Sequence, residues 1–287
     1  MVVIIGYVVA LGCIFGAYIV HGGNIAVIIH ALPTELVAIM GGALGAFVVN
    51  NQPKVLKATL GALPMLLRGS KHSKARYMEL MALLYDILQK ARKEGLMAIE
   101  DDVETPQDSA LFQKYPVISG DHHVMVFITD YLRMMVSGNL NAHEIESLMD
   151  SEIETHHHEV NGPAAALARL AGALPAFGII AAVLGVVNTM GSVGQAPAIL
   201  GAMIGSALVG TFLGILLAYC VVEPLAGLLE QKNDENGKEL QCIKTTLLAS
   251  MQGYAPQVAI EFGRKVLFSG DRPSFTELEG HVKGKKA

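Results

Sequence analysis

Charged residues are excluded from two long hydrophobic zones of the chain. From Leu170 to Val222 there is no Asp, Glu, Lys or Arg, and from Met1 to Asn51 the only such residue is Glu35. Small and polar residues interrupt each zone once, which divides the zones into four segments. Because a helix needs about 20 residues to cross the hydrocarbon of a bilayer, we interpret these segments as membrane spans. The predicted spans are Val2–Val20, Leu36–Val49, Leu170–Met190 and Ala198–Leu225.

The second span is short unless it extends toward Pro33 and Pro53, and Glu35 and Glu223 are expected at span ends, where an acid costs little. The first span lacks the basic start and the small-residue cleavage site of a signal peptide, so we expect it to be retained.

Of the 287 residues, 52% are hydrophobic and 16% are charged, whereas an average chain is about 25% charged. The net charge of −5 argues weakly against nucleic acid as a partner.

The distribution of positive charge predicts the orientation of the chain in the membrane. Residues 51–76 contain basic side chains and no acid, whereas the connectors 21–34 and 191–197 contain no Lys or Arg. Since basic loops stay on the cytoplasmic side, both polar segments and both termini should be cytoplasmic. The basic residues are Lys54, Lys57, Arg68, Lys71, Lys74 and Arg76. The predicted division is transmembrane residues 1–50, a cytoplasmic domain 51–169, transmembrane residues 170–228 and a cytoplasmic tail 229–287.

The polar segments have the periodicity of helices. Apolar side chains recur every three or four residues from Leu80 to Ala91, and Gly95 can close this helix as its C-cap. Asn141 and Glu144 form a capping-box pattern at the start of a second helix. No alternating strand pattern is convincing. We therefore predict an all-α integral membrane protein with four transmembrane helices, a large helical cytoplasmic domain between spans 2 and 3, and a cytoplasmic C-terminal tail.

His156, His157 and His158, close to Glu152, Glu154 and Glu159, are the obvious candidate metal ligands. Consecutive side chains point about 100° apart on a helix, whereas zinc-binding helices place His at positions i and i+4. We interpret the cluster as part of a surface helix near lipid headgroups and predict no metal site and no cofactor. The sequence also lacks G-x-S-x-G, H-E-x-x-H and C-x-x-C motifs, so it is not expected to be an enzyme.

Glycines recur at four-residue spacing in the predicted spans, as in helices whose backbones pack closely in lipid. These small residues exceed what four helices of one chain require, so we predict a homo-oligomer. Pro175 in the third span and Pro224 near the inner end of the fourth would bend their helices, either as fixed kinks or as hinges. The glycine pairs are Gly12/Gly16, Gly41/Gly45, Gly201/Gly205 and Gly210/Gly214.

Proton transport through a bilayer needs a titratable group near its centre. The third and fourth spans contain no carboxylate, and their hydroxyls either bond to their own helices or line a narrow path for an ion. If this chain conducts protons, the carboxylate must therefore come from another polypeptide. The polar residues of these spans are Asn188, Thr189, Ser192, Ser206, Thr211 and Tyr219.

Ordered motifs over nearly the whole chain resemble the MotA family of flagellar stator subunits. Shorter matches occur in the first span and in the polar segments. The most specific motifs are Leu174-Pro175-Ala176-Phe177-Gly178-Ile179, the run Val209-Gly210-Thr211 through Ala218-Tyr219, and Gly253-Tyr254-Ala255-Pro256 followed by Glu261-Phe262-Gly263-Arg264-Lys265.

This resemblance implies a bacterial inner-membrane protein, with a pentamer of the chain around a dimer of MotB. The MotB membrane helix would carry the proton-accepting aspartate, and its other domain would bind peptidoglycan. The resemblance also implies that Arg92 and Glu100 engage the rotor protein FliG, although the residues alone favour a solvated surface. Pro175 and Pro224 would take part in the conformational cycle, and Thr211 would face the carboxylate of MotB.

The transported ion can be inferred from one position. Sodium-type relatives resemble this chain but carry threonine where Ala182 aligns, and sodium must be held by several oxygens at once. With alanine there, only Thr211 can offer a side-chain oxygen to the ion near the site, so we expect H⁺ rather than sodium. We expect Tyr219 on the same partner-facing path. Alternatives are a sodium-driven stator, an ExbB/TolQ-type energiser of outer-membrane transport, which typically has three spans, and a scaffold or metal-dependent enzyme built on residues 156–158.

Overall fold

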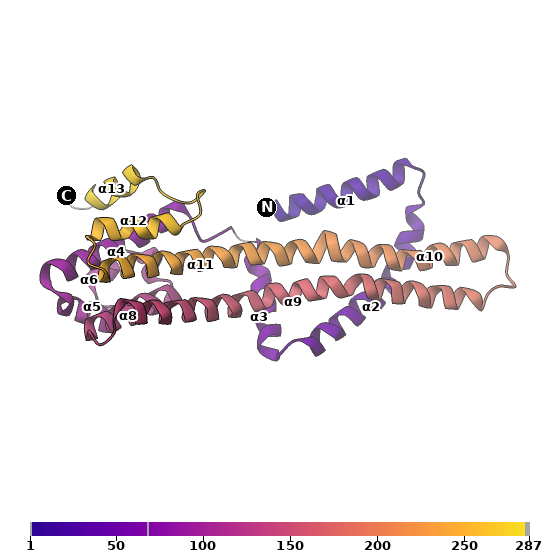
Figure 1. The fold of residues 1–287 in the computed structure, drawn as a ribbon. Coiled ribbons are helices and arrows are strands. Elements are labelled where there is room, and N and C mark those ends of the chain that lie inside the picture. Colours follow the sequence, from indigo (N-terminus) through magenta and orange to yellow (C-terminus); the bar gives the residue numbers. More distant parts are fainter. Residues whose placement is uncertain (1, 68, 285–287) are drawn as a thin grey trace. The chain divides into compact units, whose positions relative to one another are not determined.

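The chain consists of helices joined by short connections, and the computed structural model describes residues 2–67 and 69–284 (Figure 1). No strand occurs among these residues, which confirms the prediction of an all-α protein. Packing defines two compact units, which we name the span unit (residues 1–69 and 160–231) and the polar unit (residues 70–159 and 232–287). Arg68, one of the basic residues used to predict orientation, lies outside the described residues.

Four helical runs of the described chain are long and apolar enough to cross a membrane, in agreement with the four predicted spans. The first is α1 (Val2–Val20), whose bounds equal those predicted. The others are α2 (Ile25–Asn50), α9 (Ala142–Met190) and the run that begins with α10 (Pro197–Leu216). The predicted third span, which begins at Leu170, is therefore the second part of a longer helix.

The second span is longer than predicted, because α2 begins at Ile25 and continues through Pro33. Asn24 caps this helix: its side chain accepts a hydrogen bond from the backbone N–H of Ala26 at 3.0 Å. A proline is tolerated within a membrane helix where the freed carbonyl finds other partners. Glu35 consequently lies well inside the helix, and the expectation that this acid sits at a span end is wrong.

The fourth span is interrupted, although the sequence predicts one helix over Ala198–Leu225. A π-helical segment, Leu217–Val222, follows α10 and leads into α11 (Glu223–Met251). Pro224 accounts for this interruption, because it has no N–H to donate to the preceding turn. The preceding turn widens to a π pattern instead, as π-bulges within α-helices do.

The polar unit contains the helix ends that the sequence predicted. Gly95 closes α4 (Lys74–Glu94) at φ 92°, a conformation that favours glycine. Asn141 accepts hydrogen bonds from the N–H groups of His143 and Glu144 at 3.0 Å, and the Glu144 carboxylate accepts one from Asn141 N–H at 2.9 Å. The other helices of this unit are the 3₁₀-helix Leu96–Ile99, α5 (Glu100–Glu104), α6 (Ala110–Gln113), α7 (Pro116–Ser119), α8 (His122–Ser137), α12 (Pro256–Val266) and α13 (Phe275–Gly284), and α3 (Pro53–Leu67) belongs to the span unit.

Each unit has its own hydrophobic core. In the span unit, Ala62 of α3 shares a core with Ala164 of α9, so residues 51–69 and 160–169 group with the spans rather than with the polar unit. Burial of large apolar side chains stabilises the polar unit in the same way as a soluble domain. Its fully buried side chains include Tyr77, Leu80, Leu84, Phe112, Phe127, Leu132, Ile243 and Leu247.

Candidate functional site

The helices α9 and α10 of the span unit cross at glycines. A Cβ added at Gly178 would lie 2.8 Å from the carbonyl oxygen of Gly210 and 3.0 Å from the Cα of Gly214. Further along, a Cβ added at Gly185 would lie 2.6 Å from the Cβ of Ala207. Since side chains at these positions would separate the helices, the glycines allow the two backbones to make direct contact.

The predicted glycine pairs match these contacts only in part. Gly210 and Gly214 lie at the crossing, where both contact Gly178 of α9, and Gly185 of α9 contacts Ala207 instead. Gly178 and Gly185 are two helical turns apart, so the four-residue spacing does not include them. Gly42 packs directly under the ring of Phe177. At other predicted glycines, an added Cβ would have no atom of the same chain within 4 Å. These are Gly12, Gly16, Gly41, Gly45 and Gly201.

Three predicted pathway residues lie near the crossing. Ala182 is 8% exposed, and its backbone nitrogen lies 3.2 Å from the position of a Cβ added at Gly210. Thr211 follows Gly210 directly and is half-buried. Pro175 is also half-buried and lies one turn before Gly178 on α9. The structure therefore brings Ala182 close to the turn of α10 that contains Gly210 and Thr211. Pro175 lies one turn away from the contact between Gly178 and α10.

The other two predicted residues belong to the interruption after α10. Tyr219 lies in the π-helical segment and is 58% exposed, and Pro224 is the second residue of α11. The hydroxyl of Tyr7 on α1 donates a hydrogen bond to the carbonyl oxygen of Val221 in that segment at 3.0 Å. Carbonyl groups in an irregular helical turn are accessible to such outside donors. The π-helical segment therefore serves as a polar attachment point for α1.

In the polar unit, Arg92 and Glu100 lie on either side of the turn that ends α4. Arg92 is in the last turn of α4, and Glu100 is the first residue of α5. Both side chains are exposed. An ion pair between Lys90 Nζ and Asp102 Oδ2, 2.7 Å apart, joins α4 to α5. Arg92 and Glu100 are therefore presented on one surface segment whose two helices are tied together.

A surface groove of about 450 Å³ opens beside Arg92. Its walls come from the end of α4, the end of α8 and the turn between α11 and α12, and they include Leu96, Met135 and Tyr254. Leu96 and Tyr254 are 41% and 46% exposed, which is high for large apolar side chains. Sequence reasoning identified the charged residue but missed the groove, because segments far apart in the chain form it.

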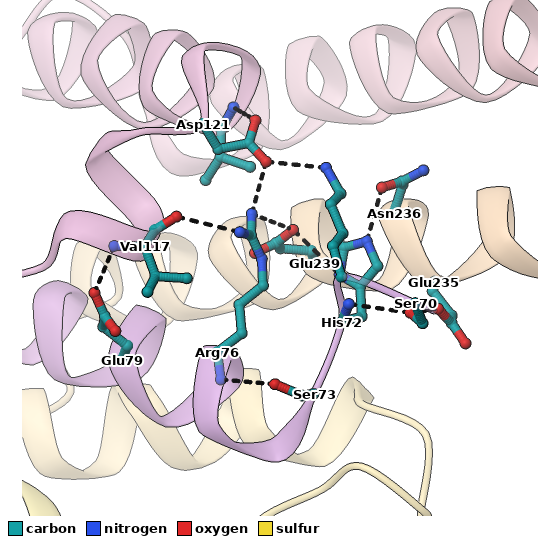
Figure 2. A network of polar contacts seen from close by, with 12 residues as sticks. Ser70, His72, Ser73, Arg76, Glu79, Val117, Asp121, Glu235, Asn236 and Glu239 are labelled. Atoms are coloured by element: carbon teal, nitrogen blue, oxygen red, sulfur yellow. Dashed lines mark hydrogen bonds and ion pairs between the residues drawn. The ribbon is translucent and has the colours of Figure 1, made fainter. Parts of the chain in front are cut away.

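A network of charged side chains, with Arg76 and Glu239 buried at its centre, links α4 to α11 and to the start of α8 (Figure 2). The sequence analysis did not predict it. The Arg76 guanidinium donates hydrogen bonds from Nε and Nη2 to the two carboxylate oxygens of Glu239, at 2.8 and 3.1 Å. Nη2 also donates to Asp121 Oδ2 at 2.7 Å, and Lys71 Nζ reaches the same oxygen at 2.9 Å. A guanidinium can donate to two carboxylates at once because its donors are held in a planar fork.

His72 borders this network and is buried as well. Its Nε2 donates to Asn236 Oδ1 at 2.7 Å, and its Nδ1 lies 3.4 Å from Glu239 Oε2 without a hydrogen bond. Burial lowers the pKa of His72, against the opposing effect of the Glu239 charge. Burial alone would raise the pKa of Asp121, but the hydrogen bond from Lys71 and the charges of Lys71 and Arg76 outweigh it, so that pKa is lowered.

One sequence signal could have revealed the network. Arg76 is in register with Leu80, Leu83 and Ile87 on the apolar stripe of α4, and Glu239 similarly precedes Ile243 on the stripe of α11. A charged residue on the buried stripe of a helix must find a partner of opposite charge. The stripe therefore predicts that each residue is paired, but it cannot identify which residue is the partner.

The histidine cluster has contacts of another kind. His156 stacks on His123 of α8, with ring centroids 3.9 Å apart and an angle of 22° between the planes. Burial, followed by the charge of His123, lowers the pKa of His156. Within residues 2–67 and 69–284, no group of three His, Cys, Asp or Glu side chains is arranged to hold a metal ion.

Comparisons with known proteins cover almost all of the chain. Two family models match, "Motility protein A N-terminal" over residues 4–95 and "MotA/TolQ/ExbB proton channel family" over residues 121–242. Motility protein A of Escherichia coli strain K12 is 51% identical over 286 residues, which cover 100% of this chain and 96% of that protein.

Two solved structures have the same fold. The flagellar MotAB stator complex from Bacillus subtilis contains a chain with a TM-score of 0.71 and 26% identity, covering 90% of this chain and 92% of that one. The C. jejuni MotAB structure contains a chain with a TM-score of 0.75 and 22% identity, covering 95% of this chain and 98% of that one.

Proposed function

The chain belongs to the motility protein A family and is a subunit of the flagellar stator, and we propose that it conducts protons together with MotB and drives the rotor protein FliG. One observation carries this proposal: α9 and α10 cross in direct contact and have no acid or base from Leu170 to Val222. A proton needs a titratable group near the centre of the bilayer. The aspartate of MotB, next to Thr211, supplies that group.

The choice of a proton rests on the chemistry at the crossing. Ala182 offers a methyl group and is nearly buried, so Thr211 is the hydroxyl-bearing residue of this pair. Sodium requires several oxygen ligands, whereas a proton requires one carboxylate and a chain of water or hydroxyl groups. The sodium-driven alternative would need oxygen ligands that α9 and α10 lack at this level.

The motion follows from neutralising the aspartate. One charge that falls through 100 mV releases about 2.3 kcal/mol, several times the thermal energy. Protonation removes the cost of an ionised carboxylate in a low-dielectric site and so changes which packing is preferred. Pro175 and Pro224 are the hinges for this change, because each lies where the regular hydrogen bonding of its helix is broken.

The arrangement in the membrane follows from the distribution of charge and of small residues. Basic residues of 51–76 keep the polar unit and both termini on the cytoplasmic side of the bacterial inner membrane. The glycines of α1 and α2 at which an added Cβ would meet no atom of the same chain, with the exposed apolar side chains around them, face lipid and neighbouring copies. Five copies surround a dimer of MotB.

Arg92 and Glu100 transmit the motion to FliG. Their exposure, their opposite charges and the apolar groove beside Arg92 are the properties of a docking surface for a charged partner. The ion pair between Lys90 and Asp102 joins α4 to α5, so a movement of α4 also moves Arg92 and Glu100.

Reconstitution in liposomes tests the proton pathway. The purified chain alone should be tight to protons under an applied voltage, and the chain with MotB should conduct them. Replacement of the MotB aspartate by asparagine should abolish the flux. Steady proton leakage through the chain alone would refute the proposal, and flux that requires sodium would establish the sodium-driven alternative instead.

A further inference from the structure

Glu35 is an acid within a membrane span, and the proton pathway described above does not use it. It lies on α2, roughly 15 Å along the helix axis from Ile25 and roughly 22 Å from Asn50, at 1.5 Å per residue. In a hydrocarbon layer about 30 Å thick, these lengths put Glu35 close to mid-depth. A carboxylate at that depth is costly and is usually functional.

The carboxylate of Glu35 reaches the crossing of α9 and α10. Its Oε2 atom lies 2.5 Å from the position that a Cβ would take at Gly210, and the backbone nitrogen of Ala182 is 3.2 Å from the same position. The missing side chain at Gly210 therefore makes room for the carboxylate. Because Thr211 follows Gly210 directly, the carboxylate lies at the level of the proposed ion pathway.

Oε2 of Glu35 is buried, and no described residue donates a hydrogen bond to it. No Lys, Arg, Asp or other Glu occurs in α1, in α2, or in the spans of α9 and α10. An ionised carboxylate without a donor or counter-charge is strongly disfavoured in such surroundings. The other titratable side chains of these helices and of the π-helical segment are His30, Tyr7, Cys13, Tyr18, Tyr219 and Cys220.

We propose that Glu35 is a proton-binding residue of the stator subunit itself, additional to the aspartate of MotB. This inference rests on the function proposed above. In the packing observed here, the Glu35 carboxyl group holds a proton and is neutral. When α2 shifts against α10 so that water reaches Oε2, the group passes its proton to a water molecule, which becomes hydronium. A hydronium ion from the pathway reverses the step, leaving water and the neutral acid.

This exchange links proton occupancy to helix packing. The neutral acid is compatible with the closed contact at Gly210, and the ionised form requires an open, hydrated one. Protonation therefore favours one of two packings of α2 on the α9–α10 pair, and the free-energy difference between them can contribute to each step. A purely structural acid would remain protonated in both.

Infrared spectroscopy of the reconstituted complex with MotB tests for this proton. A carbonyl stretch of a neutral carboxylic acid should be present, should shift on labelling with ¹³C-glutamate, and should lose intensity while protons flow. Glu35→Gln should remove the band, and the control Glu223→Gln, at the exposed start of α11, should retain it. A spectrum without a neutral glutamate band, or a band that Glu35→Gln leaves in place, would overturn the inference.

Proton flux through the same liposomes gives a second readout. Glu35→Gln keeps the size and neutrality of the protonated acid but cannot release a proton, so flux should fall several-fold while Glu223→Gln leaves it unchanged. Unchanged flux in Glu35→Gln refutes this inference alone, whereas a wild-type complex that conducts no protons refutes the proposed function. If Glu35→Gln fails to assemble, the labelled wild-type spectrum decides, since glutamates exposed to water are ionised at neutral pH.

Discussion

The Arg76 guanidinium and the Glu239 carboxylate are joined by two hydrogen bonds inside the polar unit, with nitrogen–oxygen distances of 2.8 and 3.1 Å. Their side chains are only 6% and 2% exposed, and they come from helices α4 and α11, which are far apart in the sequence. Charges so deeply buried are stable only while both partners are present. This buried ion pair therefore connects α4 to α11.

Removal of Arg76 should destabilise the protein severely. Arg76→Ala leaves the Glu239 charge buried without its partner, at an expected cost of about 3–5 kcal/mol. The measurement is the apparent melting temperature of the purified protein in detergent. Arg133→Ala is the matched control, because Arg133 forms its ion pairs at the surface and should change stability by about 0–1 kcal/mol. Equal effects of the two substitutions would contradict the buried ion pair.

Acidification should destabilise the polar unit through His72. Burial lowers its pKa in the folded state below the ordinary value of 6.5, so the neutral form is the one that folding favours. This contribution to stability is present above pH 6.5 and is lost as the pH falls through the folded-state pKa. The lowered pKa of Asp121 acts in the same direction at more acid pH, since its ionised form is the favoured one.

The test compares melting temperatures of the wild type and of His72→Gln at about pH 7 and about pH 5. Glutamine is polar and does not titrate, so the variant should lose less stability between the two pH values than the wild type. The difference between the two losses reports the contribution of His72, because Asp121 is present in both proteins. An identical loss in both would assign the acid sensitivity to other groups.

The α9–α10 crossing should not tolerate a methyl group. Gly178→Ala would bring a Cβ to 2.8 Å from the Gly210 carbonyl oxygen, a backbone atom that cannot move aside alone. Overpacking of this kind costs about 1–3 kcal/mol, and it should also lower swimming speed. Gly172→Ala on the same helix is the control, because its Cβ would meet nothing within 4 Å. A stable, fully motile Gly178→Ala protein would show that this close contact is not required.

Charge reversal should abolish the proposed contact with the rotor. Combined Arg92→Glu and Glu100→Lys substitutions invert the exposed charges beside the groove, so swimming in soft agar should be lost while the protein remains in the membrane at normal levels. Lys114→Glu, an exposed basic residue elsewhere in the polar unit, should swim normally. Wild-type swimming by the double variant would refute the proposed role of Arg92 and Glu100.

The sequence predicted the features of this protein that depend on neighbouring residues. Val2–Val20 was correct at both ends, because a continuous apolar run and its polar borders define a span locally. Gly95 and the Asn141–Glu144 capping box were correct for the same reason, since each satisfies backbone groups within one turn. The start of α2 was missed because a proline and an acid close together, here Pro33 and Glu35, are typical of a connector between spans. In the structure, α2 continues through both residues.

The hydrophobic pattern of the sequence did not predict contacts between distant segments. Gly178 could not be matched to Gly210, nor Arg76 to Glu239, because periodicity shows which face of a helix is buried but not which helix covers it. The same holds for Glu35, an acid expected at a span border, whose Oε2 atom is instead buried against Gly210. Sequence by itself therefore determined the four spans and the helix ends at Val20, Gly95 and Asn141, which local hydrogen bonding and hydrophobicity control. Tertiary structure alone decided which charged groups lose their water, because that depends on the helices packed around them.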